Sequence, residues 1–285
     1  MKKPMFLTVV AAFGLLSVMM SVTARHAQAG GNTTQSGGNT KKDFVAPIVF
    51  QAAGPTITSI QGSVDGFRAA LGANNGITAP PQPLTEGRRE INWDGGNPAN
   101  TATTLTPTPI LDTFLIGRGA RFTTPGSGFV QAPASGLAAA DVFGNPSYAT
   151  IFKAFSPSRL FSPIGSNVTD TLFFVPGGGE VRATTRGFGA VFTDVDQPGA
   201  SKKGKHGASS QIEYFDADGE LLFTSFIPAS PGDGSLSFFG IVFEDARIAR
   251  VRITSGNVAP GPDDDAKLDI VMMDDFLYGE PQHLL

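Results

Sequence analysis

The chain has 285 residues, with 21 Lys and Arg against 25 Asp and Glu, and it contains no cysteine. Disulfide scaffolds, cysteine nucleophiles and thiolate metal sites are therefore excluded. Residues 1–29 are predicted to be a signal peptide, because Lys2 and Lys3 precede a long apolar run that ends at the small-residue motif AQA, residues 27–29. An uncleaved membrane anchor is the alternative for this segment.

Cleavage after Ala29 removes Lys2, Lys3 and Arg25, three of the 21 basic residues, which leaves 18 against 25 acidic residues and a net charge of −7. Binding to phosphates needs clustered positive charge, so nucleic acid and anionic membranes are disfavoured as partners. No second apolar run is long enough to cross a bilayer, so no membrane span is expected after signal removal. We expect a monomer that is secreted or held in the periplasm or cell envelope.

The mature chain is predicted to form a single domain behind a tether. Residues 30–42 (GGNTTQSGGNTKK) are polar and rich in Gly, as flexible tethers are. Residues 43–281 contain no linker and no fixed-period repeat, so one β-sandwich domain is expected there. Residues 282–285 are predicted to be a short tail.

The first part of the domain is predicted to hold short strands and one helix. Residues 43–51 are a strand candidate, and residues 63–71 are the best helix candidate, with Ser63 as the capping residue. Residues 97–109 lack periodicity, and a helical turn is expected near residues 111–116. Further strands are predicted at residues 89–94, 119–124, 128–131, 158–163, 171–175 and 181–185.

The C-terminal part is a series of short strands rich in Phe, Ile, Val and Thr, separated by Gly, Pro, Asp or Ser. This spacing predicts an all-β antiparallel sandwich. Arg250 and Arg252 alternate with apolar residues and are expected on the face away from the core. Asp216 to Glu220 is predicted to be a hairpin turn with a positive φ at Gly219. The strands are predicted at residues 187–195, 209–215, 221–228, 236–244, 248–256 and 267–278.

Carboxylates are the main chemistry that remains. After signal removal the histidines are His206 and His283, both in segments that are expected to be solvated. No nucleophile elbow, zinc-protease helix or phosphate-binding loop is present. Hard carboxylate oxygens suit Ca²⁺, so a structural calcium ion is a candidate cofactor. The candidate metal ligands are Asp194, Asp196, Asp274 and Asp275.

Asp274 and Asp275 are unusual because the last strand is apolar on both faces. Strict alternation would place the two carboxylates on opposite faces, with at least one of them in the core. A buried carboxylate needs a cation, an arginine or several N–H donors. Arg250 or Arg252, backbone amides and Ca²⁺ are the alternatives for that partner.

A sugar-binding site is expected to offer an exposed aromatic platform. The mature chain has one Trp, three Tyr and 21 Phe, and the Phe residues at strand positions are expected to fill the core. Trp93 and Asp94 are therefore the candidate ligand-binding residues. A half-buried packing role is the alternative for Trp93.

Several segments carry a family resemblance that covers most of residues 43–281. The chain resembles a group of secreted bacterial proteins without an assigned biochemical function, which are similar in pattern to galactose-binding-like or lectin-like jelly rolls. The resemblance implies secretion and an antiparallel β-sandwich of jelly-roll type with one short N-terminal helix, and it implies no catalytic residues. The segments include INWDG, GFGAVFTDVD and MDDFLYGEP, at residues 91–95, 187–196 and 273–281.

The function expected from the sequence is an exported, non-catalytic binding module for a glycan or another cell-surface polymer, with or without calcium. One alternative is a carboxylate-based glycan hydrolase or lyase, for which Asp94, Asp194 and Asp196 are the first candidates. Another alternative is a structural component of an extracellular matrix.

Overall fold

The computed structural model describes residues 46–95, 102–198, 210–263 and 268–284. These residues belong to one unit that extends from Lys42 to Leu285. The predicted signal peptide, the predicted tether and His206 lie outside the described residues, so the predictions made for them stay predictions.

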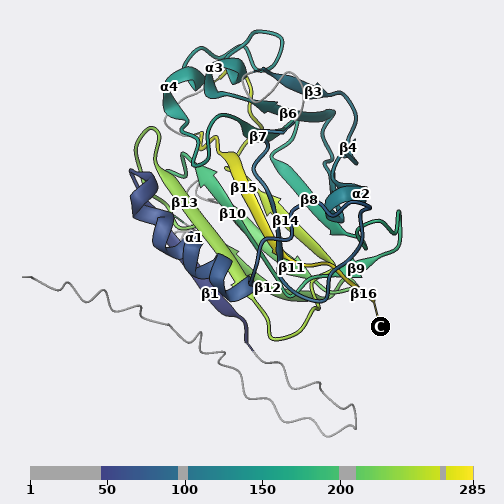
Figure 1. Ribbon diagram of the computed structural model, residues 1–285. Coiled ribbons are helices and arrows are strands. Elements are labelled where there is room, and N and C mark those ends of the chain that lie inside the picture. Colours follow the sequence, from purple (N-terminus) through teal and green to yellow (C-terminus); the bar gives the residue numbers. More distant parts are fainter. Residues whose placement is uncertain (1–45, 96–101, 199–209, 264–267, 285) are drawn as a thin grey trace, which may run out of the picture. The chain divides into compact units, whose positions relative to one another are not determined.

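The described residues form two large sheets, one small sheet and a few helices (Figure 1). The eight-stranded sheet contains β1 (Ile48–Gly54), β2 (Arg88–Ile91), β3 (Thr104–Thr106), β6 (Gly128–Ala132), β7 (Leu160–Ile164), β10 (Gly187–Thr193), β13 (Leu236–Val242) and β15 (Met272–Gly279). The six-stranded sheet contains β4 (Ile110–Leu111), β5 (Ala120–Thr123), β8 (Val168–Phe173), β11 (Gln211–Phe215), β12 (Leu221–Phe226) and β14 (Arg250–Thr254). The remaining elements are β9 (Ala183–Thr184), β16 (Gln282–His283), α1 (Ile57–Leu71), α2 (Leu115–Arg118), α3 (Ala134–Leu137) and α4 (Tyr148–Ile151).

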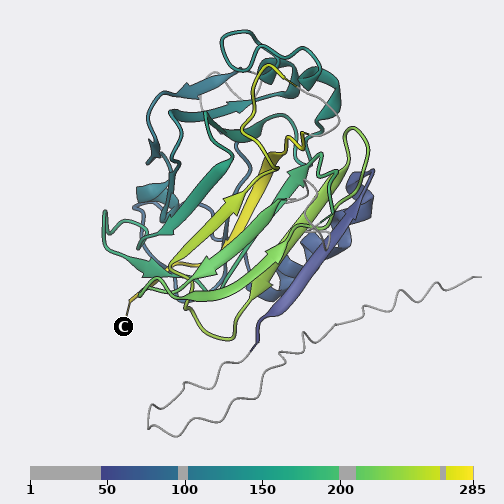
Figure 2. The same cartoon turned by 180° about the vertical axis from the view of Figure 1, so that it is seen from behind.

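The strand order is β1-β13-β10-β15-β7-β6-β3 in the first sheet, with β2 also paired to β15, and β12-β11-β14-β8-β5-β4 in the second. The strands in both sheets pair antiparallel (Figure 2). The predicted all-β antiparallel sandwich is therefore confirmed.

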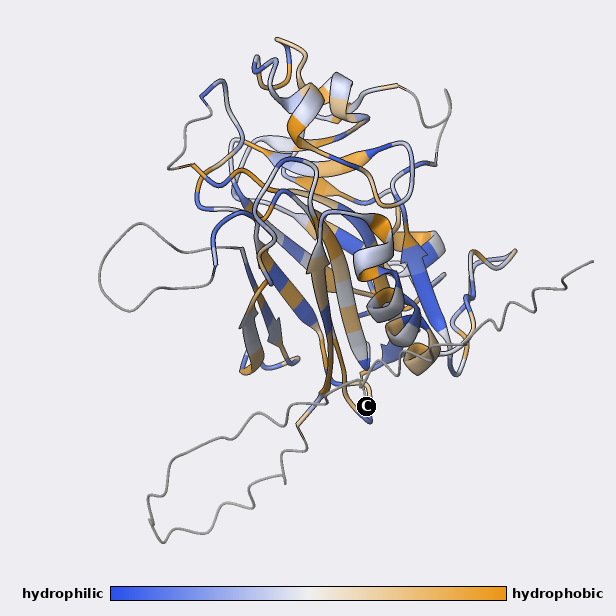
Figure 3. Ribbon diagram, turned by 90° about the vertical axis from the view of Figure 1, so that its left-hand side faces the viewer, coloured by the Kyte–Doolittle hydropathy of each residue, from blue (hydrophilic) through white to orange (hydrophobic). Residues whose placement is uncertain are grey.

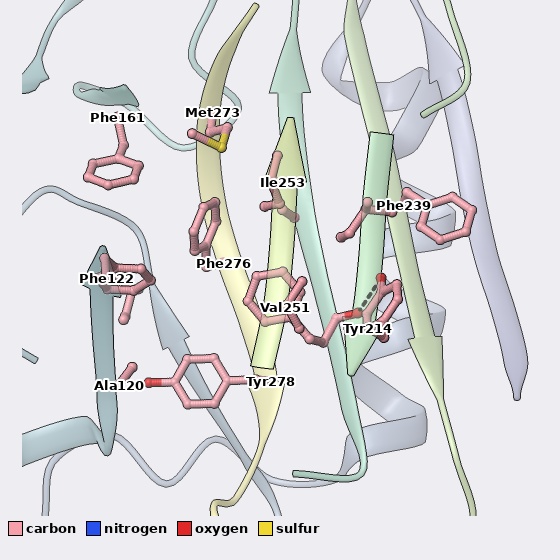
Figure 4. Close-up of a cluster of buried hydrophobic side chains, with 14 of the residues drawn as sticks. Ala120, Phe122, Phe161, Tyr214, Phe239, Val251, Ile253, Met273, Phe276 and Tyr278 are labelled. Carbon is pink, nitrogen blue, oxygen red and sulfur yellow. Dashed lines mark hydrogen bonds between the residues drawn. The ribbon is translucent and has the colours of Figure 1, made fainter. Parts of the chain in front are cut away.

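Phenylalanine fills the space between the two sheets, as the composition predicted (Figure 4). Phe122, Phe161 and Phe276 are fully buried and lie in one aromatic cluster. Full burial of such a side chain contributes about 1.5–3 kcal/mol. The hydroxyl group of Tyr214 donates to the carbonyl of Phe188 at 3.1 Å, so this polar atom is satisfied inside the core.

Helix α1 begins earlier than predicted. Thr56, not Ser63, is the capping residue, and its hydroxyl accepts a hydrogen bond from the Ser59 amide at 3.3 Å. The Ser63 hydroxyl instead donates to the carbonyl of Gln51 on β1 at 3.0 Å. The apolar side of α1 packs on the outer face of the eight-stranded sheet, whereas polar residues occupy its other side (Figure 3). The buried residues of α1 are Ile60, Val64, Phe67 and Leu71.

Two further predictions need correction. The stretch 97–109 was expected to be a connection without periodicity, yet its described part contains β3, which pairs with β6. The predicted tail contains β16, which pairs with β9. Both strands are two or three residues long, and such short segments carry no readable period.

Candidate functional site

Strand β15 contains a β-bulge at the two aspartates. Phe192 of β10 pairs with Met273, and Ala190 pairs with Phe276, so Asp274 and Asp275 together lie opposite one residue, Val191. Both carboxylates then contact groups on the outer side of the eight-stranded sheet, namely residues 155–156 and, for Asp275, Arg68 of α1. The expectation that they lie on opposite faces is wrong, because the extra residue breaks the period of two.

Asp274 receives its hydrogen bonds from the backbone of the segment 155–159. Its Oδ2 accepts from the Phe155 amide at 2.6 Å and from the Ser156 amide at 3.2 Å. The Ser156 hydroxyl lies within hydrogen-bond distance of Asp274 and of Asp275. Of the partners considered from the sequence, backbone amides are thus the ones that hold Asp274.

Asp275 has an arginine partner, but not one of those expected. Arg68 of α1 donates from Nη2 to Asp275 Oδ2 at 3.3 Å and to Glu90 Oε2 at 2.9 Å. Arg250 and Arg252 pair with Asp170 instead. The expectation that either of them compensates the Asp274–Asp275 pair is therefore wrong.

Burial and proximity favour the protonated form of this pair. Burial is the largest cause that raises the pKa of Asp274 well above its usual value, and the neighbouring charge of Asp275 raises it further. Burial also raises the pKa of Asp275, although Ser156 and Arg68 act in the opposite direction. The pair therefore holds a proton at pH values where an exposed aspartate has lost it.

Trp93 lies inside the core, with 1 % of its surface exposed. Its ring stacks on Phe161, with 3.8 Å between the ring centroids and 2° between the planes. Its Nε1 donates to the carbonyl of Asp274 at 2.9 Å. With no exposed ring face to offer a sugar, Trp93 is a packing residue in this structure, and the prediction that it contacts a ligand is not supported.

Asp94 binds the same segment as Asp274 does. Its Oδ1 accepts from the amides of Ser158 and Arg159 at 2.9 Å and 2.8 Å. The structure thus brings together Trp93, Asp94, Asp274 and Asp275 around residues 155–159. Asp94 and Asp274 accept hydrogen bonds from backbone amides of this segment, so the cluster holds a loop onto the sheet.

Asp194 and Asp196 lie beyond the end of β10 and have other partners. The Asp194 amide donates to the Ser235 carbonyl at 3.1 Å. The Asp196 amide donates to Asp269 Oδ1 at 3.1 Å, and Asp196 Oδ1 accepts from the Gly232 amide at 2.8 Å. Burial, followed by the charge of Asp196, raises the pKa of Asp269 to about 6.

Among the described residues, no three His, Cys, Asp or Glu side chains are placed so that they could hold a metal ion together. The four predicted ligands are instead divided between two places, the bulge of β15 and the end of β10. Metal binding by either pair stays a prediction.

A pocket of about 770 Å³ lies at the C-terminal end of α1. It contains none of the residues predicted from the sequence. Its acidic residues are Glu86, which is exposed, and Glu280, which is buried in an ion pair with Arg89 at 2.6 Å. Both oxygens of the Glu280 carboxylate accept hydrogen bonds from the buried Arg89, so this carboxylate is held by the fold at the edge of the pocket.

The outer face of the six-stranded sheet is a second candidate site, which the sequence reasoning passed over. Along β14, Val251 and Ile253 point into the core, so Arg250 and Arg252 point outward, as the alternation predicted. Gln211 and Glu213 of β11 follow the same alternation. We call this surface the open face and define it by Asp170, Gln211, Glu213, Thr224, Phe226, Arg250 and Arg252.

Pairing across the strands fixes the neighbours on the open face. Arg252 lies opposite Asp170 on one side and opposite Glu213 on the other. The Arg252 guanidinium binds Asp170 through two hydrogen bonds, of 2.7 Å and 2.9 Å. Gln211 lies opposite Phe226, and the Gln211 amide group donates to the Thr224 hydroxyl at 2.9 Å. Hydrogen-bonding groups and an apolar ring are thus adjacent there.

The same face carries an arginine stacked on a ring. The guanidinium carbon of Arg250 lies 3.8 Å from the centroid of the Phe215 ring, and its Nη1 donates to Asp170 at 3.2 Å. Phe226 on the edge strand β12 keeps 38 % of its surface exposed. Phe226 therefore offers the accessible aromatic surface that Trp93 does not.

A comparison with protein-family models finds no family that matches the chain, and a comparison with curated proteins finds no match either. None of the helices in the described ranges has the length and apolar character that crossing a membrane requires.

Proposed function

We propose that the protein is an exported, non-catalytic module that binds an extracellular glycan or similar cell-surface polymer through the open face. The observation that carries the proposal is the contrast between the outer faces of the two sheets. On the eight-stranded sheet, α1 packs against β1, β13 and β15, and α3 packs against β6. On the six-stranded sheet, the side chains of Phe226, Thr224 and Arg252 remain accessible.

A sheet face of this kind suits an extended ligand. Neighbouring strands lie about 4.8 Å apart, so the four strands from β12 to β8 present contacts over a width of about 15 Å. An apolar ring beside amide, hydroxyl and guanidinium groups matches a sugar, which has both C–H and O–H surfaces. Export, proposed from residues 1–29, would bring the module to such polymers.

We also propose that the sandwich is a jelly roll. Its strand pairs are nested along the chain: β11 pairs with β12, β10 with β13, β8 with β14 and β7 with β15. Successive pairs alternate between the six-stranded and the eight-stranded sheet. A long hairpin wound around a common core gives this nesting, which supports the resemblance to jelly-roll proteins.

The hydrolase and the matrix component are the weaker alternatives. Asp94 accepts two backbone hydrogen bonds, and Asp196 accepts one from Gly232, so both carboxylates already hold loops. Calcium is not part of the proposal, because amides, Ser156 and Arg68 surround the carboxylates of Asp274 and Asp275. A matrix role would need no accessible aromatic residue on a sheet face.

The test is retention of the mature chain, starting at Gly30, on immobilised polysaccharides, together with an assay for released reducing sugar. We expect retention without product release. Steady product release that disappears in Asp94→Asn or Asp194→Asn would favour the enzyme instead. N-terminal sequencing of exported material should begin at Gly30, whereas an intact Met1 in the membrane fraction would contradict cleavage.

A further inference from the structure

The charged groups of the open face are already paired with one another. Arg250 and Arg252 share the carboxylate of Asp170, and Glu213 lies opposite Arg252. At the other side of the same sheet, Arg121 on β5 lies between Asp112 and Glu180, at 2.5 Å and 2.7 Å. The guanidinium groups therefore leave little positive charge to attract an anion.

The charge of the whole protein acts in the same direction. The chain carries 25 acidic residues against 21 basic ones, so its long-range potential repels polyanions. The paired groups still have hydrogen-bonding capacity. Arg252 donates to Asp170 from Nε and Nη2, and Arg250 donates to Asp170 from Nη1. Each guanidinium has five N–H donors, so donors remain for hydroxyl groups.

The apolar contact on this face is also of a suitable kind. Phe226 lies opposite Gln211, on the same face as Thr224 and Glu213. A phenyl ring attracts the C–H face of a sugar, while Gln211 and Thr224 can each donate and accept hydrogen bonds. A hydroxyl group also donates and accepts, so it matches these side chains better than a carboxylate or a sulfate does, since those only accept.

We infer that the ligand of the open face is a neutral, polyhydroxylated polymer, bound by stacking on Phe226 and by hydrogen bonds to Gln211, Thr224 and Arg252. This inference rests on the proposed function and specifies its ligand. Uronic-acid-rich and sulfated polymers are the ligands that it excludes. Because no net ion pairing is involved, binding is insensitive to salt.

The experiment compares the mature chain on three immobilised probes: a neutral glucan or mannan, a polyuronate and a sulfated polysaccharide, each at about 0.05 M and about 0.5 M salt. We expect retention on a neutral probe that changes less than about twofold between the two salt concentrations. Tighter, strongly salt-dependent retention on either anionic probe would overturn the inference and leave the binding function standing. Retention on none of the three would overturn the proposed function itself.

Two variants test the face. Phe226→Ala removes the stacking contact and should weaken retention on the neutral probe about tenfold or more, and Thr224→Val should weaken it to a smaller degree. Ile48→Ala on β1 is the matched control, because Ile48 is also an exposed apolar residue on an edge strand, 62 % exposed. It should bind as the unchanged protein does. If Phe226→Ala keeps its melting temperature and binds normally, the ligand site is not on the open face.

Discussion

The aspartate pair Asp274–Asp275 and the single aspartate Asp170 have partners of different accessibility in this protein. Asp274 and Asp275 lie beneath α1, where amides, Ser156 and Arg68 enclose them. Asp170 lies on the open face and pairs with two partly exposed arginines. Asp170 is also mostly buried, with 13 % of its side chain exposed, but its arginine partners are 26 % and 41 % exposed, so water can solvate them if Asp170 is lost. Under α1 the donors are mostly buried, and an unpaired buried polar group is costly. Environment, more than residue type, assigns each role.

The largest expected effect comes from removing the acceptor under α1. Asp274→Ala leaves the buried amide of Phe155 and the neighbouring amide of Ser156 without their partner, at a cost of about 1–3 kcal/mol for each buried group. We expect a loss of about 3 kcal/mol in the free energy of unfolding, measured by urea denaturation. Asp170→Ala is the matched control and should cost less, because the two arginines that lose their partner are 26 % and 41 % exposed and can be solvated by water. Equal losses in both variants would contradict this distinction between the Asp274–Asp275 pair and Asp170.

The dependence of stability on pH tests the buried acid Asp269. Its folded-state pKa of about 6 exceeds the unfolded value of 3.8, so the folded protein binds this proton more tightly. The resulting stability is complete below about pH 4 and is lost as the pH rises through about 6, by at most about 3 kcal/mol. Melting temperatures of the unchanged protein and of Asp269→Asn should diverge over this range. Parallel profiles would show that Asp269 titrates normally.

A smaller effect is expected at Arg68, which is 23 % exposed in its side chain and bridges Asp275 and Glu90. Arg68→Met should reduce stability by about 1–2 kcal/mol, because Glu90 keeps Arg88 as a partner at 2.6 Å. Arg252→Met on the open face is the matched control and should cost about 0.5 kcal/mol. Thermal melts of the two variants side by side give the comparison, and a larger loss for Arg252→Met would reverse it.

The smallest effect is expected from a chelator. The carboxylates of Asp274 and Asp275 have protein partners, so EDTA should leave the melting temperature unchanged. A fall that added Ca²⁺ reverses would instead indicate a bound calcium ion, since a ligand stabilises the state that it binds. Repeating the melts with Asp194→Asn and with Asp275→Asn would then show at which of the two places the ion is held.

The sequence alone determined the class of fold and much of its local geometry. The alternation in β14 correctly predicted which side chains point outward. The prediction succeeds because β14 pairs with β11 and with β8 without a bulge, so its period of two is unbroken. The turn at Asp216 is confirmed: its Oδ1 accepts from the amides of Asp218 and Glu220, and Gly219 has a φ of 84°. These features depend on neighbours in the chain, so local propensity and period are enough to predict them.

Tertiary structure decided how the aspartates are used. At the bulge, one residue of β10 lies opposite two residues of β15, and no pattern within residues 267–278 predicts this pairing. The partners of Asp275 are equally remote, with Arg68 207 residues away and Ser156 119 residues away. The burial of Trp93 likewise results from the packing of the two sheets, which the sequence near Trp93 does not predict. The period of a sequence predicts which side chains of a regular strand share a face. Where a strand departs from that period, and which distant groups contact its side chains there, depends on long-range packing.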